Sequence, residues 1–222
     1  FKLKKLNKII LSETPSIPEI ARNTIRQEAQ SLNVLHNTID EDFDRMVGMI
    51  FHCKGKVVVT GLGKSGLVGM KIAATLNSTG TPAAFLHAAD ATHGDLGMIQ
   101  TQDVILIISK SGSSQEIINL VQILKNQGNR LIGMTANPES FLGKNTDYLL
   151  HTPMEKEACP YDLAPTTSTT LQMVMGDALA MSLMSLNGFK PKDFALLHPS
   201  GTLGKKLHLK VADLMMDQRM PR

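Results

Sequence analysis

The sequence predicts an α/β fold, in which a five-stranded parallel sheet carries helices on both faces as a doubly wound sandwich. Two observations support this prediction. Short, continuous runs of β-branched and aliphatic residues, such as 57–60 and 104–108, are typical of strands buried on both sides. The longer stretches between them repeat apolar residues at helical spacing. With 222 residues, 42% of them hydrophobic, the chain can bury such a sheet as one sizeable domain.

The first 50 residues are expected to be helical. Ser16 followed by Pro18 is typical of a helix start, because a hydroxyl caps the first turn and proline fits within it. A mixed apolar and charged pattern then continues to about Cys53, which predicts one long helix with a break near Asn37. Residues 1–14 are assigned to an N-terminal extension that resembles a short amphipathic surface helix.

Strands and helices are expected to alternate after residue 56. Gly128 and the Asn187-Gly188 pair are typical helix ends. A methionine-rich face on the last helix indicates core packing or a subunit interface. The expected strands are 57–60, 83–86, 104–108, 131–135 and 148–151, and the expected helices are 65–78, 116–126 and 166–186.

Composition argues against several classes of protein. The net charge is only +3, and no dense Lys/Arg stripe follows the N-terminal KLKK, so nucleic acid is not expected as a partner. No apolar run reaches the roughly 18 residues of a membrane span, so no membrane association is expected. The two cysteines, Cys53 and Cys159, cannot form a disulfide framework, which favours a reducing, cytoplasmic location.

The first strand leads into a glycine-rich loop, and ligands of such folds bind beyond the carboxyl ends of the strands. Residues 61–66 (GLGKSG) place Lys64 and Ser65 at a helix N-terminus, which suits an anionic group. The same G-x-G-x-x-G spacing leaves a dinucleotide-dependent oxidoreductase as an alternative. That alternative is disfavoured because no acidic residue ends the second expected strand. A turn selected only for close packing is the remaining interpretation of this loop.

The third strand leads into a loop of serines. Ser109, Ser111 and Ser114 converge with free backbone amides at another helix N-terminus, which predicts binding of a phosphate monoester. An ordinary helix cap needs only one hydroxyl, so this loop is expected to do more than cap. Glu116 follows in the first helical turn, where it serves the helix dipole or faces Lys64 across the crevice.

Two further residues are candidates for proton transfer. Glu157 precedes an apolar turn, and partial burial there would raise the pKa of its carboxyl toward neutrality, as a general base requires. A solvated loop charge is the alternative interpretation of Glu157. His198 precedes Pro199-Ser200-Gly201, so it is expected on a fixed turn and available for proton transfer.

No metal site is expected. His87, Asp90, His93 and Asp95 have the right composition for one, but their spacing matches no common ligand pattern.

Taken together, the separate motifs resemble the sugar isomerase (SIS) family, and within it the arabinose-5-phosphate isomerases. The resemblance runs from about residue 15 to the end of the chain and rests on several separated blocks. These blocks are STGTPAAFLHAADA (78–91), HGDLGM (93–98), GLGKSG (61–66), SKSGSSQE (109–116), EACP (157–160), APTTSTT (164–170), MGDALA (175–180) and DFALLHPSGTLGKKL (193–207).

The resemblance implies a SIS-type sandwich, assembled as a homotetramer, that interconverts D-ribulose 5-phosphate and D-arabinose 5-phosphate. The product would feed synthesis of Kdo, for lipopolysaccharide or capsule, and the reaction would need no cofactor. The family's functional Lys, two Glu and His correspond to Lys64, Glu116, Glu157 and His198. Its substrate-contacting positions also cover Gly80, Thr81, His87 and His93.

This resemblance suggests a division of roles around a cis-enediolate intermediate. Lys64 would stabilise the enediolate charge, and Glu116 would orient Lys64 or act as an alternative base. Glu157 and His198 would share the proton transfers, and His93 would help to open a cyclic sugar. The phosphate would be held by Ser65, Ser109, Ser111 and Ser114.

The chain departs from the family pattern in the phosphate loop. The phosphate loop often reads Asn-Ser-Gly-Glu-Ser, but here residues 110–114 read Lys-Ser-Gly-Ser-Ser, so we expect an altered phosphate affinity. Residues 15–210 are assigned to the SIS domain, and residues 211–222 resemble the beginning of a regulatory CBS module. A non-catalytic sugar-phosphate sensor and a SIS isomerase for another sugar phosphate are the alternative functions.

Overall fold

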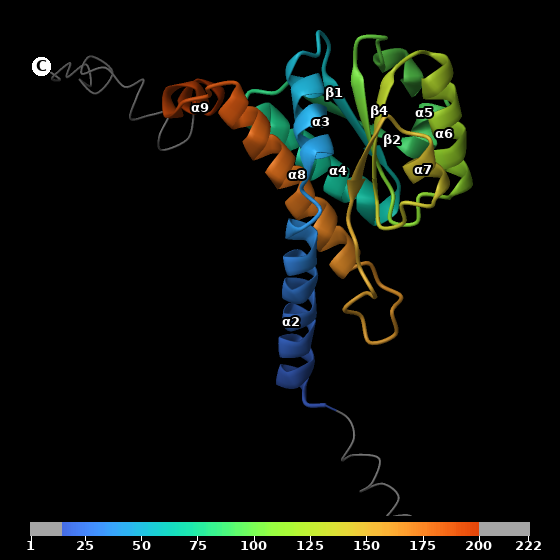
Figure 1. Ribbon diagram of the computed structural model, residues 1–222, viewed down its shortest axis with the longest axis vertical. Helices are drawn as coiled ribbons and strands as arrows, with labels where there is room; N and C mark the ends of the chain where they lie inside the picture. Colours follow the sequence, from blue (N-terminus) through green and yellow to red (C-terminus); the bar gives the residue numbers. More distant parts are fainter. Residues whose placement is uncertain (1–14, 200–222) are drawn as a thin grey trace, which may run out of the picture.

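A computed structural model describes residues 15–199 of the chain (Figure 1). The expected extension at 1–14 and the tail at 211–222 lie outside the described residues, as do Ser200 and Gly201, which follow His198 and Pro199.

The described chain forms one five-stranded sheet in which all neighbouring strands are parallel. The strands are β1 (Val57–Gly61), β2 (Ala83–His87), β3 (Val104–Ile108), β4 (Arg130–Thr135) and β5 (Tyr148–His151). Their spatial order is β2-β1-β3-β4-β5, which confirms the predicted fold class. The order changes direction between β1 and β3, and ligands of doubly wound sheets bind at such a switch point. The glycine loop and the serine loop therefore flank this position.

Within residues 15–199, two helices precede the sheet, α2 (Ile17–His36) and α3 (Glu41–Phe51). The predicted cap at the start of α2 is present, since Ser16 and Glu19 bond reciprocally in a capping box. The predicted break near Asn37 is also present. It is fixed by Asp40, whose carboxylate accepts bonds from the amides of Asp42 and Phe43 and so begins α3.

The remaining helices alternate with the strands. Three of them, α4, α6 and α8, match the predicted ranges within two residues. The other elements are too short to show a helical period and were not predicted from the sequence. The full set is α4 (Gly63–Ser78), α5 (Ala88–Ala91), η1 (Asp95–Met98), α6 (Gln115–Asn126), α7 (Phe141–Lys144), α8 (Thr167–Leu186) and α9 (Pro191–Leu197).

Side chains of the central strands alternate between two apolar cores. Val57 and Val59 pack on the face covered by α3, α4 and α8. Val58 and Ile105 pack on the opposite face, against α5, α6 and α7. Because both faces are covered, the sheet can only be approached at the ends of its strands. We call the side where the strands begin the amino edge and the side where they end the carboxyl edge.

Helices α4 and α8 lie against one another very closely. A Cβ atom on Gly176 would lie 2.3 Å from Cγ1 of Ile72, so only glycine allows this approach. Next to this contact Lys71 of α4 pairs with Asp177 of α8. The two helices lie side by side on one face of the sheet (Figure 1).

The methionine-rich face of α8 is divided between the core and the surface. Met175 is buried in the core, whereas Met173 and Met181 are exposed. Helix α2 extends beyond the sheet, on the side where the loop after β5 also projects (Figure 1). It carries exposed apolar side chains, among them Ile17 and Ile25.

Candidate active site

The glycine loop after β1 is tight and presents two polar side chains. Gly63 adopts a left-handed φ of 51°, which favours glycine, and α4 begins at this residue. Lys64 and Ser65 therefore lie in the first turn of α4, where backbone amides lack helical partners. Lys64 is exposed and Ser65 is half-buried. The first turn of α4 thus offers a cation and a hydroxyl at the switch point.

The serine loop after β3 is held in a fixed conformation. The Ser109 amide donates to the Met134 carbonyl over 3.0 Å, and the Ser109 hydroxyl accepts from the Gly112 amide over 3.1 Å. Gly112 adopts a φ of 65°, and a Cβ there would lie 2.2 Å from Oγ of Ser140. The Leu142 amide closes the contact by donating to the Gly112 carbonyl. Contacts within the chain therefore fix the conformation of the loop.

Ser114 combines a buried hydroxyl with a position at the start of α6. It is the N-cap of α6, but its side chain makes no capping bond. Its hydroxyl oxygen is buried and has no hydrogen-bond partner among the described residues. Leaving such a group unpaired costs about 1–3 kcal/mol, so this position favours a ligand that can accept its hydrogen. The exposed hydroxyl of Ser111 lies in the same loop.

Glu157 is almost completely buried, with 1% of its surface exposed, at the N-terminus of α8. Its carboxylate accepts hydrogen bonds from the Thr166 amide (2.9 Å), the Ser168 amide (3.0 Å) and the Ser168 hydroxyl (2.6 Å). The ammonium of Lys110 lies 2.8 Å from Oε1 of the same carboxylate. The carboxylate therefore binds the free amides of α8 as a capping anion would.

The expected rise in the pKa of Glu157 is wrong. Burial alone would raise this pKa, but hydrogen bonds from Lys110, Ser168 and Thr166 outweigh the burial and lower the pKa from 4.5 to about 2. The sequence could show that Glu157 precedes an apolar turn, but not that donors from Lys110, Thr166 and Ser168 surround its carboxylate. In the described arrangement Glu157 is an ionised, fully bonded carboxylate.

Glu116 and His87 lie at the same edge of the sheet. Glu116 is exposed in the first turn of α6, and among the described residues no ion pair joins it to Lys64. His87 ends β2, and its Nδ1 lies 3.6 Å from a carboxylate oxygen of Asp90. His93 follows α5 and is exposed. His87 and Glu116 therefore lie at the same end of the sheet as Lys64.

Within residues 15–199, no cluster of three or more His, Cys, Asp or Glu side chains is placed to hold a metal ion. The same part of the chain contains no helix long and apolar enough to cross a membrane.

Three of the expected residues lie elsewhere. Gly80 and Thr81 precede β2, at the amino edge of the sheet. Gly80 adopts a φ of 90° and lies against the Phe189 ring, and Thr81 is buried with no partner for its hydroxyl among the described residues. His198 follows α9, at the end of α8 opposite to the loop after β5 (Figure 1). Its ring stacks on Phe194 at 3.9 Å. One chain does not bring these residues to the switch point.

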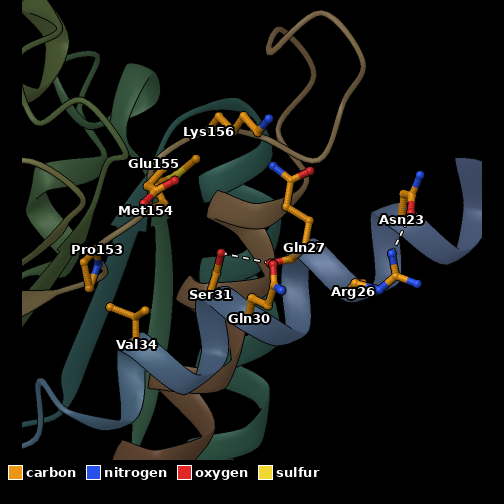
Figure 2. Close-up of a pocket in the computed structure, with 10 residues that line it drawn as sticks. All are labelled: Asn23, Arg26, Gln27, Gln30, Ser31, Val34, Pro153, Met154, Glu155 and Lys156. Carbon is orange, nitrogen blue, oxygen red and sulfur yellow. Dashed lines mark hydrogen bonds between the residues drawn. The ribbon is translucent and has the colours of Figure 1, made fainter.

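Two features of the site were not predicted. The first is the ion pair of Lys110 with Glu157, although the unusual lysine was visible in the sequence. The second is a groove of about 490 Å³ between α2 and residues 153–156. Figure 2 shows side chains from both segments lining it, and Gln27 of α2 donates to the Glu157 carbonyl over 3.2 Å. Helix α2 therefore braces the segment that carries Glu157.

Comparison with known proteins gives relatives over most of the chain. Arabinose 5-phosphate isomerase KdsD of Yersinia pestis is 53% identical over 197 residues, which are 89% of this chain. The enzyme of the same name from Pseudomonas aeruginosa is 50% identical over 195 residues, or 88% of this chain. The chain spans 60% of the length of each of these two relatives.

A solved structure of an Escherichia coli CFT073 protein in complex with arabinose 5-phosphate matches with a TM-score of 0.78 and 38% identity. The match covers 81% of this chain and 95% of that one. The profile of the SIS domain matches residues 49–182, which include the sheet, the glycine loop, the serine loop and Glu157. The chain therefore belongs to the SIS domain family.

Proposed function

We propose that this protein is an aldose–ketose isomerase that interconverts D-ribulose 5-phosphate and D-arabinose 5-phosphate. The observation that carries the proposal is the serine loop at the switch point, which is held by contacts within the chain and contains the buried Ser114 hydroxyl, unpaired among the described residues. The names of relatives at 50–53% identity support the choice of sugar. The arabinose 5-phosphate bound to the E. coli CFT073 protein also supports this choice.

The phosphate is the anchor of the proposed substrate. Ser109, Ser111 and Ser114 belong to the loop that leads from β3 into α6, and Ser65 lies across the switch point in the first turn of α4. A helix N-terminus favours a dianion through its amides and its dipole. Anchoring the phosphate fixes the carbonyl end of the sugar in one orientation, and such positioning can lower a barrier by several kcal/mol, about 7 at best.

The chemistry needs a positive group where the enediolate charge develops and a base at the carbon that loses its proton. Lys64 is exposed at the start of α4 and fits the first role. Glu116, exposed at the start of α6, is the carboxylate that is open to a substrate in the described arrangement. Glu157 would act as a base only after losing some of its donors, because its oxygens are already bonded.

A second copy of the chain would complete this site. Gly80, Thr81 and His198 lie at the opposite edge from Lys64, so a neighbouring subunit must bring them if they contact the substrate. The exposed isoleucines of α2 support an assembly, since such apolar surface is usually covered by a partner. We propose that the assembly is a homotetramer and that residues 15–210 form its isomerase domain. His87 and His93 would lie near the sugar.

We place the reaction in the cytoplasm, in the supply of Kdo for lipopolysaccharide or capsule. Incubation of the purified protein with ribulose 5-phosphate, followed by an assay for arabinose 5-phosphate, tests the activity directly. A Ser114→Ala variant should raise KM, because the anchor loses a donor. Phosphate binding without turnover would instead support the sensor, and turnover of another sugar phosphate would replace the proposed substrate.

A further inference from the structure

Lys110 connects the serine loop to the start of α8. Its backbone is fixed at the carboxyl edge, because its carbonyl accepts bonds from the Ala136 amide (3.1 Å) and the Thr135 hydroxyl (2.9 Å). Its side chain reaches the start of α8, where its ammonium lies 2.8 Å from Oε1 of Glu157. A single residue of the loop proposed to bind phosphate therefore contacts the carboxylate that caps α8.

The two partners differ in how firmly they are held. The Glu157 side chain is fully buried and is bonded to Thr166 and Ser168 as well as to Lys110. The Lys110 side chain is 43% exposed, and Glu157 is the only carboxylate within 4 Å of its ammonium among the described residues. If one partner moves, it is Lys110, because its flexible stem reaches solvent.

A phosphate in the serine loop would compete for this ammonium. Lys110 lies between Ser109 and Ser111 in the sequence, so a dianion bound to their hydroxyls would be a close neighbour of its side chain. A phosphate ester carries nearly two negative charges at neutral pH, whereas Glu157 carries one. Both anions attract the same cation in a partly desolvated site.

We propose that Lys110 is a positioning residue whose ammonium is shared between Glu157 and the substrate's phosphate, so that phosphate binding is coupled to the start of α8. This inference rests on the phosphate anchor of the proposed function. Glu157 holds the cation in the free protein and so weakens phosphate binding. When phosphate binds, it draws Lys110 toward the loop and loosens the contact with residues 157–168.

The test measures the affinity of the full chain for inorganic phosphate by calorimetric titration. Lys110→Met should weaken binding about tenfold, because the cation is lost. Glu157→Gln should tighten binding several-fold, because it releases Lys110 from a competing anion. The double variant should lack this gain and bind as Lys110→Met does. Lys125→Met, on the exposed side of α6, is the matched control and should bind as the wild type does.

A bridge with a merely structural role would give a different pattern, because loss of either partner would weaken phosphate binding. That pattern would overturn the proposal. A second measurement uses only folded wild-type protein with ¹⁵N-labelled lysine. The ammonium signal missing from Lys110→Met should shift as phosphate is added, and an unmoved signal would equally overturn the inference. Turnover of ribulose 5-phosphate without either response would contradict this inference alone, whereas the predicted responses without turnover would contradict only the proposed activity.

Discussion

At the carboxyl edge of the sheet, the candidate site consists of polar side chains of the glycine loop and the serine loop. The serine loop is fixed by its backbone, yet the Ser114 hydroxyl remains unpaired among the described residues and Lys64 is exposed. At the amino edge, Gly80 lies against the Phe189 ring and His198 stacks on Phe194. The first edge presents exposed polar side chains, whereas Gly80 and His198 at the second edge pack against aromatic rings of their own chain.

The family resemblance and the geometry of one chain therefore give different groupings of the site residues. The resemblance groups Lys64 and His198 in one site, but the chain places them at opposite edges. Both statements can hold if the amino edge of one copy meets the carboxyl edge of another. The predictions that follow test this idea.

The largest expected effect is at Lys64. Lys64→Met should lower kcat about 10²–10³-fold, because it removes a charge positioned for the developing oxyanion. The free energy of unfolding should change by less than about 0.5 kcal/mol, since the side chain is exposed. Steady-state assays and chemical denaturation measure the two quantities. Unchanged kcat would remove Lys64 from the mechanism, and Lys125→Met serves as the control for losing a surface charge.

The next effect is on stability, at Glu157. Its lowered pKa means that its bonds stabilise the folded chain above pH 4.5, where the carboxyl is ionised in both the folded and the unfolded state. The shift from 4.5 to about 2 corresponds to a contribution on the order of 3 kcal/mol at neutral pH. Glu157→Gln should lose most of this contribution in urea unfolding at pH 7.

The lowered pKa of Glu157 also predicts how the stability of the folded chain changes with pH. In the wild-type chain this contribution should disappear as the pH falls from 4.5 through about 2, because protonation breaks the bonds to Lys110 and Ser168. The Glu157→Gln variant should show a smaller loss of stability over this interval. Equal slopes for both proteins would mean that Glu157 is not the group responsible.

A mixing experiment tests whether two copies complete the site. Lys64→Met and His198→Gln should each be nearly inactive alone. If the residues come from different subunits, some mixed assemblies contain a site with both wild-type side chains. Unfolding and refolding the variants together should then raise activity at least about tenfold above either alone. A mixture no more active than its components, with exchange shown by mass spectrometry, would mean that one chain must supply both residues.

The sequence predicted the sheet well because its strands are continuously apolar. Val104–Ile108 is buried along its whole length, and such runs leave little choice of structure. Long helices with a clear period, such as α6, were predicted for the same reason. Helices α5, α7 and α9 have four to seven residues, which is too few for a period to be recognised.

Only local parts of the candidate site can be predicted from the sequence. The serine loop follows one strand and leads into one helix, so its place at the carboxyl edge is a local property. The state of Glu157 depends on Lys110, 47 positions earlier, and this contact follows from the packing of two loops rather than from either alone. The expectation that burial would set the pKa of Glu157 is wrong, because hydrogen bonds from Ser168 and Lys110 outweigh the effect of burial.

The smallest effect concerns Gly80, and it shows whether the amino edge does more than pack. Gly80→Ala places a methyl group about 2.6 Å from the Phe189 ring at a φ of 90°, so the chain should lose about 1–3 kcal/mol of stability. Gly188→Ala is the matched control. Gly188 also has a positive φ, of 61°, but has no atom within 4 Å of the added Cβ, so Gly188→Ala should lose about 1 kcal/mol less than Gly80→Ala.

Both proteins are then assayed well below their melting temperatures. If Gly80 contacts the substrate across a subunit boundary, Gly80→Ala should raise KM several-fold while Gly188→Ala leaves it unchanged. Equal KM values would mean that Gly80 serves only the packing of Phe189.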